Sequence, residues 1–148
     1  MRPAHLIDVL LQQTQALQET LDVAVRQREA LKSGRLDLLQ GLMKELHDAS
    51  FRAQALDRRR EQEAASLART LGVHPRLSEI LAKLNEGERD ALSSVAGKFS
   101  LVVRKLQAEM KIISRLADES QRLGDLMLSE WRRMENAFSP GNGFDLKG

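Results

Sequence analysis

The sequence predicts an all-α protein: an elongated antiparallel helical bundle of three to four helices with a long C-terminal helix. Apolar residues recur every three or four positions over long stretches, which places them on one face of a helix. Leu, Ala, Arg, Gln and Glu are abundant, and these residues lose little on entering a helix. A chain of 148 residues is long enough for a single helical domain with a modest core.

The composition narrows the class of protein further. Hydrophobic residues make up 42% of the chain and charged residues 30%, which is typical of a soluble folded protein. The absence of cysteine excludes disulfides, thiolate metal sites and cysteine nucleophiles. No apolar run approaches the ~20 residues of a membrane span, and the N-terminal residues turn polar too early for a signal peptide. We therefore expect a cytoplasmic protein.

The first helix is expected over residues 3–32. Pro3 suits a first helical turn, because its missing N–H has no partner to lose there. Ser33 and Gly34 end the pattern, and Gly34 can adopt the left-handed conformation that closes many helices. The chain either reverses at this point in a tight hairpin or continues as one kinked helix.

Two further helices are expected over residues 35–71 and 76–84. The longer one crosses an almost wholly polar stretch at residues 57–63, whose charges we expect to project into water. Gly72 and Pro75 separate the two helices, since Gly favours a helix end and Pro cannot continue one.

The last segment predicts one long helix over residues 88–138, followed by a flexible tail at residues 139–148. Gly97 and Gly124 lie inside this helix and could kink it, but the lack of a neighbouring Pro favours continuity. The stripe from Leu92 onwards would extend roughly 70 Å at 1.5 Å per residue. That length exceeds what a compact domain of this size needs.

The end of this long helix is the candidate partner-binding site. Its apolar residues are Leu123, Leu126, Met127, Trp131, Met134 and Phe138. Either they pack against the first helices and complete the core, as most amphipathic helices do, or they form an exposed patch for a partner helix. Periodicity alone favours the core, whereas the length of the helix and the Trp and Met side chains near its end argue for the patch, so both interpretations stay open.

The sequence contains no recognisable catalytic constellation, so we expect no enzymatic activity, no cofactor and no metal. His5, His47 and His74 are far apart and lack metal-ligand spacing. The basic cluster at residues 58–60 is flanked by acidic residues, which is typical of a solvated helix face. With a net charge of only +2, we expect no nucleic-acid partner; a nucleic-acid-binding protein would instead show salt-sensitive retention on DNA.

One segment resembles a known family. Residues 28–39, REALKSGRLDLL, followed by Met43, Lys44 and Glu45, resemble the FlgN family of flagellar export chaperones, as do the size and the order of helices from Leu6 to Phe138. The resemblance implies a cytoplasmic type III secretion chaperone. It implies that the C-terminal amphipathic helix binds protein clients, the hook–filament junction subunits, before export, and it leaves contact with export-apparatus components open. By position, this helix contains the six apolar residues named above.

A structural coiled coil or a homo-oligomeric scaffold is the alternative function. Such a protein would use the same apolar stripes but would cover them by self-association instead of by a client. Light scattering at several concentrations separates the two alternatives, because only the scaffold is an obligate oligomer.

Overall fold

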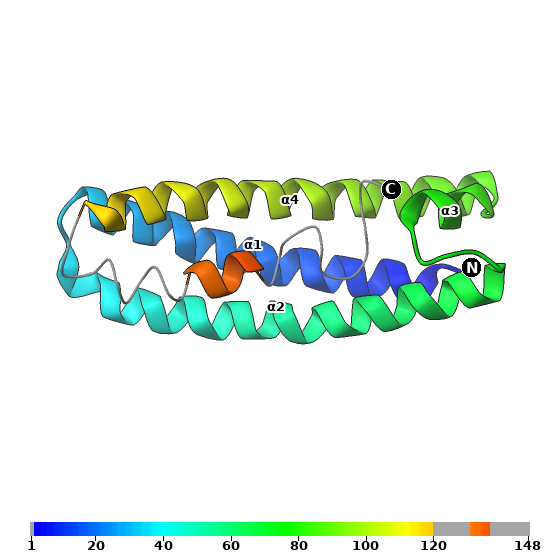
Figure 1. Cartoon of the computed structure of the whole chain (residues 1–148), viewed down its shortest axis with the longest axis horizontal. Helices are drawn as coiled ribbons and strands as arrows, with labels where there is room; N and C mark the ends of the chain where they lie inside the picture. Colours follow the sequence, from blue (N-terminus) through cyan, green and yellow to red (C-terminus); the bar gives the residue numbers. More distant parts are fainter. Residues whose placement is uncertain (1, 120–130, 137–148) are drawn as a thin grey trace.

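The computed structural model describes residues 2–119 and 131–136, and these residues form an all-α helical bundle (Figure 1). Four helices follow one another along the chain: α1 (Ala4–Lys32), α2 (Leu36–Leu71), α3 (Leu77–Ala82) and α4 (Glu86–Asp118). The first three begin and end within two residues of the limits expected from the sequence. Residues 131–136 are also helical.

α1 and α2 form an antiparallel hairpin, so the chain reverses after residue 32 and does not continue as one kinked helix. Gly34 adopts the expected positive φ, 67°. Its N–H donates to the carbonyl of Leu31 at 3.3 Å. The next N–H, that of Arg35, donates to the carbonyl of Ala30 at 2.8 Å. These two hydrogen bonds satisfy carbonyls that the last turn of α1 leaves without a helical partner.

The ends of the later helices follow the same local rules. Gly72 closes α2 with a φ of 73°. Asn85 begins α4 as a reciprocal cap: its Oδ1 accepts from the N–H of Glu88 at 2.8 Å, and its own N–H donates to Glu88 Oε1 at 3.2 Å. These hydrogen bonds give the N–H groups of Asn85 and Glu88 the acceptors that the first turn of α4 does not provide.

α1 packs against both α2 and α4, which lie on either side of it in Figure 1. α2 and α3 return the chain along the bundle, so α4 runs parallel to α1. By contrast, no Cα atom of α2 comes within 8 Å of a Cα atom of α4. α1 and the side chains that fill the intervening space therefore hold these two helices together. We call the volume bounded by α1, α2 and α4 the interhelical space.

The structure corrects the expectation of a single helix over residues 88–138. α4 begins at Glu86, continues through Gly97 without a break and ends at Asp118. Residues 131–136 form a separate helical stretch that lies beside the middle of the bundle, not beyond the end of α4 (Figure 1). A helix continuing straight to residue 138 would carry its apolar stripe into water, whereas the observed path buries Trp131 and Met134.

Candidate helix-binding site

The structure describes two of the six residues expected to bind a partner, Trp131 and Met134. Trp131 is 1% exposed and Met134 is 0% exposed, and both belong to the hydrophobic core formed with the other helices. The remaining four lie outside the described residues: Leu123, Leu126, Met127 and Phe138.

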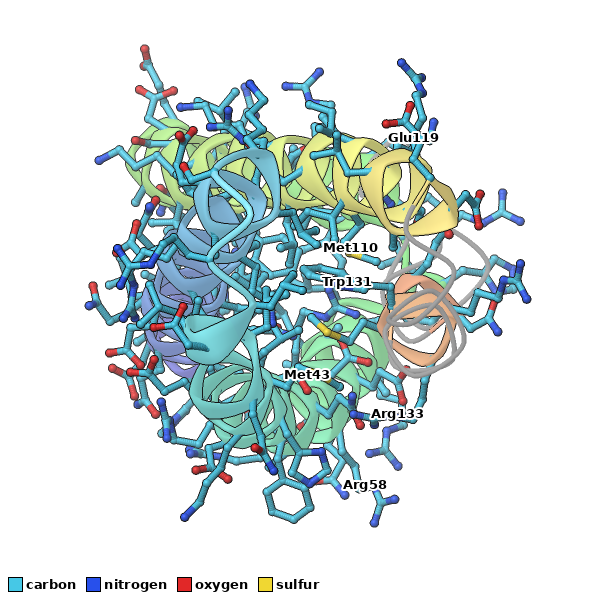
Figure 2. All side chains as sticks on the ribbon, turned by 90° about the vertical axis from the view of Figure 1, so that its left-hand side faces the viewer. Met43, Arg58, Met110, Glu119, Trp131 and Arg133 are labelled. Atoms are coloured by element: carbon cyan, nitrogen blue, oxygen red, sulfur yellow. The ribbon has the colours of Figure 1, made fainter. Side chains whose placement is uncertain are left out.

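This burial decides between the two interpretations of the stripe for Trp131 and Met134. In the free chain these two side chains complete the core. Figure 2 shows why: residues 131–136 lie on the far side of the bundle from α1, between α2 and α4. Because α2 and α4 stay apart, large side chains are needed to fill the interhelical space, and Trp and Met supply that volume.

The helical stretch at residues 131–136 also makes a polar contact with α2. Arg133 Nη2 donates to the hydroxyl oxygen of Ser50 at 3.5 Å, which is a long hydrogen bond. Ser50 is fully buried and also donates to the carbonyl of His47 at 3.3 Å. Apolar burial on one face and a hydrogen bond at the edge therefore hold this stretch against α2.

A row of polar side chains on α1 points into the interhelical space. Gln13, Thr20 and Gln27 are seven residues apart and are all fully buried. Other buried residues of α1 lie on both sides of this row: Val9, for example, lies on one side and Leu10 on the other. Since α1 packs against α2 and α4, the middle row of its buried face is directed between them.

Hydrogen bonding in this row is incomplete. Gln13 Nε2 donates to Asp57 Oδ1 at 3.2 Å, but its Oε1 accepts no hydrogen bond. Thr20 donates to the carbonyl of Ala16 at 2.9 Å. Gln27 makes no hydrogen bond with either atom of its amide. A buried polar group without a partner loses its hydration and receives nothing in return, so each one destabilises the free chain.

Arg60 of α2 reaches across the interhelical space to α4. Its guanidinium carbon lies 5.1 Å from the centroid of the Phe99 ring of α4, and its Nη2 forms an ion pair with Asp57. Burial lowers the pKa of Arg60 below its ordinary value, while the charges of Asp57 and Glu61 act in the opposite direction.

The burial of Arg60, which is only 5% exposed, corrects the expectation that the whole polar stretch at residues 57–63 projects into water. Arg58 and Arg59 are exposed as expected. The stretch keeps helical periodicity, so one residue in each turn faces inward. At this position the inward residue is an arginine whose charge has a carboxylate partner and an aromatic ring beside it.

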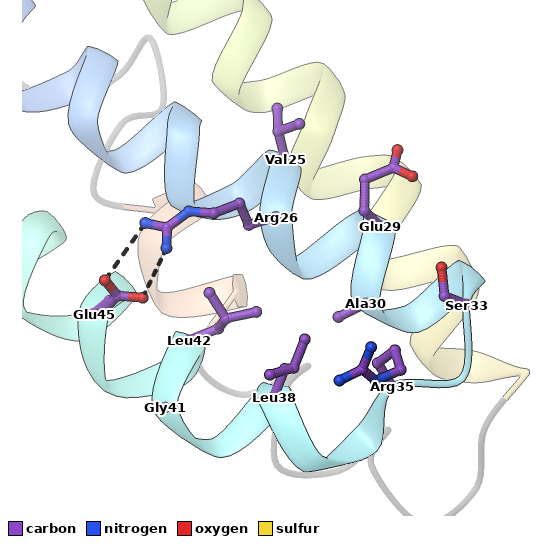
Figure 3. A pocket seen from close by; sticks show the side chains of 10 residues that line it. All are labelled: Val25, Arg26, Glu29, Ala30, Ser33, Arg35, Leu38, Gly41, Leu42 and Glu45. Carbon is purple, nitrogen blue, oxygen red and sulfur yellow. Dashed lines mark hydrogen bonds and ion pairs between the residues drawn. The ribbon is translucent and has the colours of Figure 1, made fainter.

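A second surface feature lies at the α1–α2 hairpin. An open hollow there has a volume of about 590 Å³. Leu38 and Leu42 line its α2 side and Ala30 its α1 side (Figure 3). The ion pair between Arg26 and Glu45 closes one edge. The segment that carries the family resemblance forms the hairpin around this hollow, so its Leu and Gly residues have a local structural role in the turn.

Residues 2–119 and 131–136 contain no group of three His, Cys, Asp or Glu side chains placed to hold a metal ion. Among the helices of these same residues, none is long and apolar enough to cross a membrane.

The polar row on α1 is the feature that sequence reasoning missed. The burial of Gln13, Thr20 and Gln27 was not predicted from the sequence. The available signal was the spacing: Gln13, Thr20 and Gln27 repeat with the same seven-residue period as the leucines beside them. Only the packing of α1 against two helices shows that the middle of its stripe is buried.

Comparison with known proteins identifies the family. The model of the FlgN protein family matches residues 1–139. Comparisons with curated proteins and with solved structures give no match. Because the family match covers all but the last nine of 148 residues, the chain belongs to the FlgN family of flagellar export chaperones.

Proposed function

We propose that this protein is a cytoplasmic chaperone that binds hook–filament junction subunits before their export. The family match over residues 1–139 is the observation that carries the proposal. The client-binding residues would be the six apolar side chains of the C-terminal region: Leu123, Leu126, Met127, Trp131, Met134 and Phe138.

The mechanism would be physical and would involve no covalent chemistry. Subunits that assemble through apolar terminal helices associate prematurely if those helices remain exposed in the cytosol. A chaperone that buries such a helix removes apolar surface from water, which contributes ~25 cal/mol per Å² before the cost of ordering both partners. Met side chains adapt their shape, so one surface can accept more than one client.

The burial of Trp131 and Met134 sets a condition on this mechanism. Both side chains are enclosed in the free chain, so a client can contact them only after residues 131–136 leave the interhelical space. The free energy needed to open the chain subtracts from the binding free energy. The apparent affinity is then lower than the intrinsic affinity by the fraction of chains that are open.

Direct titration of the full chain with purified hook–filament junction subunits tests the proposal. We expect a complex whose dissociation constant can be measured by calorimetry, and no complex with an export subunit from another part of the flagellum. Trp131→Asp should abolish binding, and Phe51→Asp is the matched control because Phe51 is an aromatic residue that is 66% exposed.

Two further measurements keep this test interpretable. Far-UV circular dichroism must show that the Trp131→Asp chain is still helical, since Trp131 is part of the core. Phe138→Asp supplies a second variant at the other end of the proposed site. Failure of the unmodified chain to bind any hook–filament junction subunit would contradict the proposal, and an obligate oligomer in light scattering would favour a scaffold.

A further inference from the structure

We infer that the interhelical space is itself a binding site for an amphipathic helix of the exported client, and that residues 131–136 occupy this site in the free chain. The inference rests on the proposed function and adds the place where the client helix lies. It also specifies which side chains of the chaperone contact that helix.

The interhelical space already accepts a helix. Residues 131–136 are helical, and their two buried side chains, Trp131 and Met134, are three residues apart and therefore on one face. This stretch lies between α2 and α4, which do not approach each other closely enough to close the space alone (Figure 2). When Trp131 and Met134 leave to contact a client, the apolar walls they cover become exposed to water. A client helix that enters the same space covers those walls again.

The position of this stretch along the bundle follows from its contact with Ser50 and from the ion pairs that align α1 with α2. Ser50, which binds Arg133, lies on α2 between Glu45 and Arg52. These two residues pair across the hairpin with Arg26 and Glu19 of α1. The stretch therefore lies alongside the section of α1 that contains Thr20 and approaches Gln27.

Gln27 indicates which kind of client helix would fit the interhelical space better than residues 131–136 do. Its side chain is fully buried, and both its Oε1 and its Nε2 lack partners while residues 131–136 occupy the space. A client helix that carries an Asn, Gln or Ser side chain beside its apolar face can supply the missing hydrogen bond. The favoured client segment is thus a helix with large apolar side chains three or four residues apart and an amide or hydroxyl group next to them.

Locking the resident stretch in place tests whether the client needs the interhelical space. The chain has no cysteine, so in a Ser50→Cys, Arg133→Cys chain only the two introduced thiols react with a short reversible cross-linker. We expect the cross-linked chain to bind a hook–filament junction subunit at least about tenfold more weakly than the same chain after the cross-link is cleaved. The two single-cysteine chains, treated with the same reagent, control for modification alone.

The possible outcomes separate this inference from the proposed function. If the cross-linked chain binds the subunit as well as the cleaved chain, the client does not use the interhelical space and the inference is wrong, although the chaperone function stands. If neither form binds and the unmodified chain also fails, the proposed function is wrong. Loss of binding only in the cross-linked form supports the inference.

A second variant tests contact between the client and the polar row on α1. Gln27→Leu removes the unpartnered amide, so we expect a higher melting temperature for the free chain. We also expect about three- to tenfold weaker binding of the subunit, because one client hydrogen bond is lost. Gln15→Leu makes the same change on the exposed face of α1 and should leave the affinity unaltered. Equal affinity of the Gln27→Leu and unmodified chains would show that the client does not reach α1, and the inference would fall.

Discussion

The guanidinium of Arg60 on α2 lies 5.1 Å from the centre of the Phe99 ring on α4. This contact crosses the interhelical space, and Trp131 and Met134 fill another part of it. α2 and α4 are thus connected by a buried charge over an aromatic ring and by a part of the chain that follows both helices. The first connection is made by a side chain of α2, whereas the second is made by residues 131–136, which lie outside the four helices.

Arg60 is expected to stabilise the bundle despite its charge. In an Arg60→Ala chain, Asp57 keeps its hydrogen bond from Gln13 but loses its ion pair, and the Phe99 ring loses its covering group. We expect the free energy of unfolding in urea to fall by about 3 kcal/mol. Arg58→Ala is the matched control, since Arg58 is exposed and its loss should change stability by less than about 0.5 kcal/mol. Equal effects of the two substitutions would contradict the buried position of Arg60.

Trp131 is the only tryptophan, so its fluorescence reports on the position of residues 131–136 alone. Because the side chain is 1% exposed, we expect weak quenching by acrylamide in the free chain and strong quenching after unfolding. Trp131→Ala should lower the free energy of unfolding by about 3–5 kcal/mol. Phe51→Ala, at an exposed aromatic, should have little effect. Strong quenching of Trp131 in the folded chain would show that the stretch is displaced even without a client.

Glu88 is expected to make stability depend on pH. Burial by itself would raise the pKa of Glu88, but hydrogen bonds from the backbone N–H groups of Asn85 and Arg2 and from the Arg2 guanidinium together lower the pKa below its ordinary value of 4.5. A carboxylate whose pKa is lower in the folded state stabilises that state above pH 4.5. This stabilisation is lost as the pH falls below 4.5 and through the folded-state pKa.

The measurement is the melting temperature between pH 6 and pH 3 for the unmodified chain and for Glu88→Gln. Over this range the melting temperature should fall further for the unmodified chain than for the variant, because only the former loses the charged form of Glu88. Glu86→Gln, at an exposed position in the same turn, controls for a general effect of charge. Parallel curves for the unmodified and Glu88→Gln chains would contradict the expected shift.

Two glycines should respond to alanine with opposite signs. Gly72 has a φ of 73°, so a Cβ atom there strains the backbone, and we expect Gly72→Ala to destabilise the chain by about 1 kcal/mol. Gly97 lies inside α4 with nothing within 4 Å of an added Cβ. Gly97→Ala should therefore stabilise the chain by about 0.5–1 kcal/mol through its higher helix propensity. Thermal unfolding of both variants provides the comparison, and destabilisation by both would argue against a continuous α4.

The positions of the first three helices could be predicted because their signals are local. Gly34 and Gly72 end helices through their own backbone conformation, and leucines at helical spacing mark the face that must be buried. The inward-facing Gln13, Thr20 and Gln27 were not predicted, because polar side chains alone do not indicate whether a second and a third helix cover them. The sequence left open whether Trp131 and Met134 are core or exposed, because periodicity does not show which protein covers a stripe; the structure places both in the core.

The amino-acid sequence by itself determined the all-α class, the helix ends up to residue 86, and the family. Only the tertiary packing shows where Trp131 and Met134 lie. Periodicity identifies the side chains that must avoid water, but the same stripe can be covered by the chain's own helices or by another protein. For Trp131 and Met134, the chain's own helices cover the stripe. α2 and α4 lie too far apart to pack on each other, and these two large apolar side chains fill the space between them.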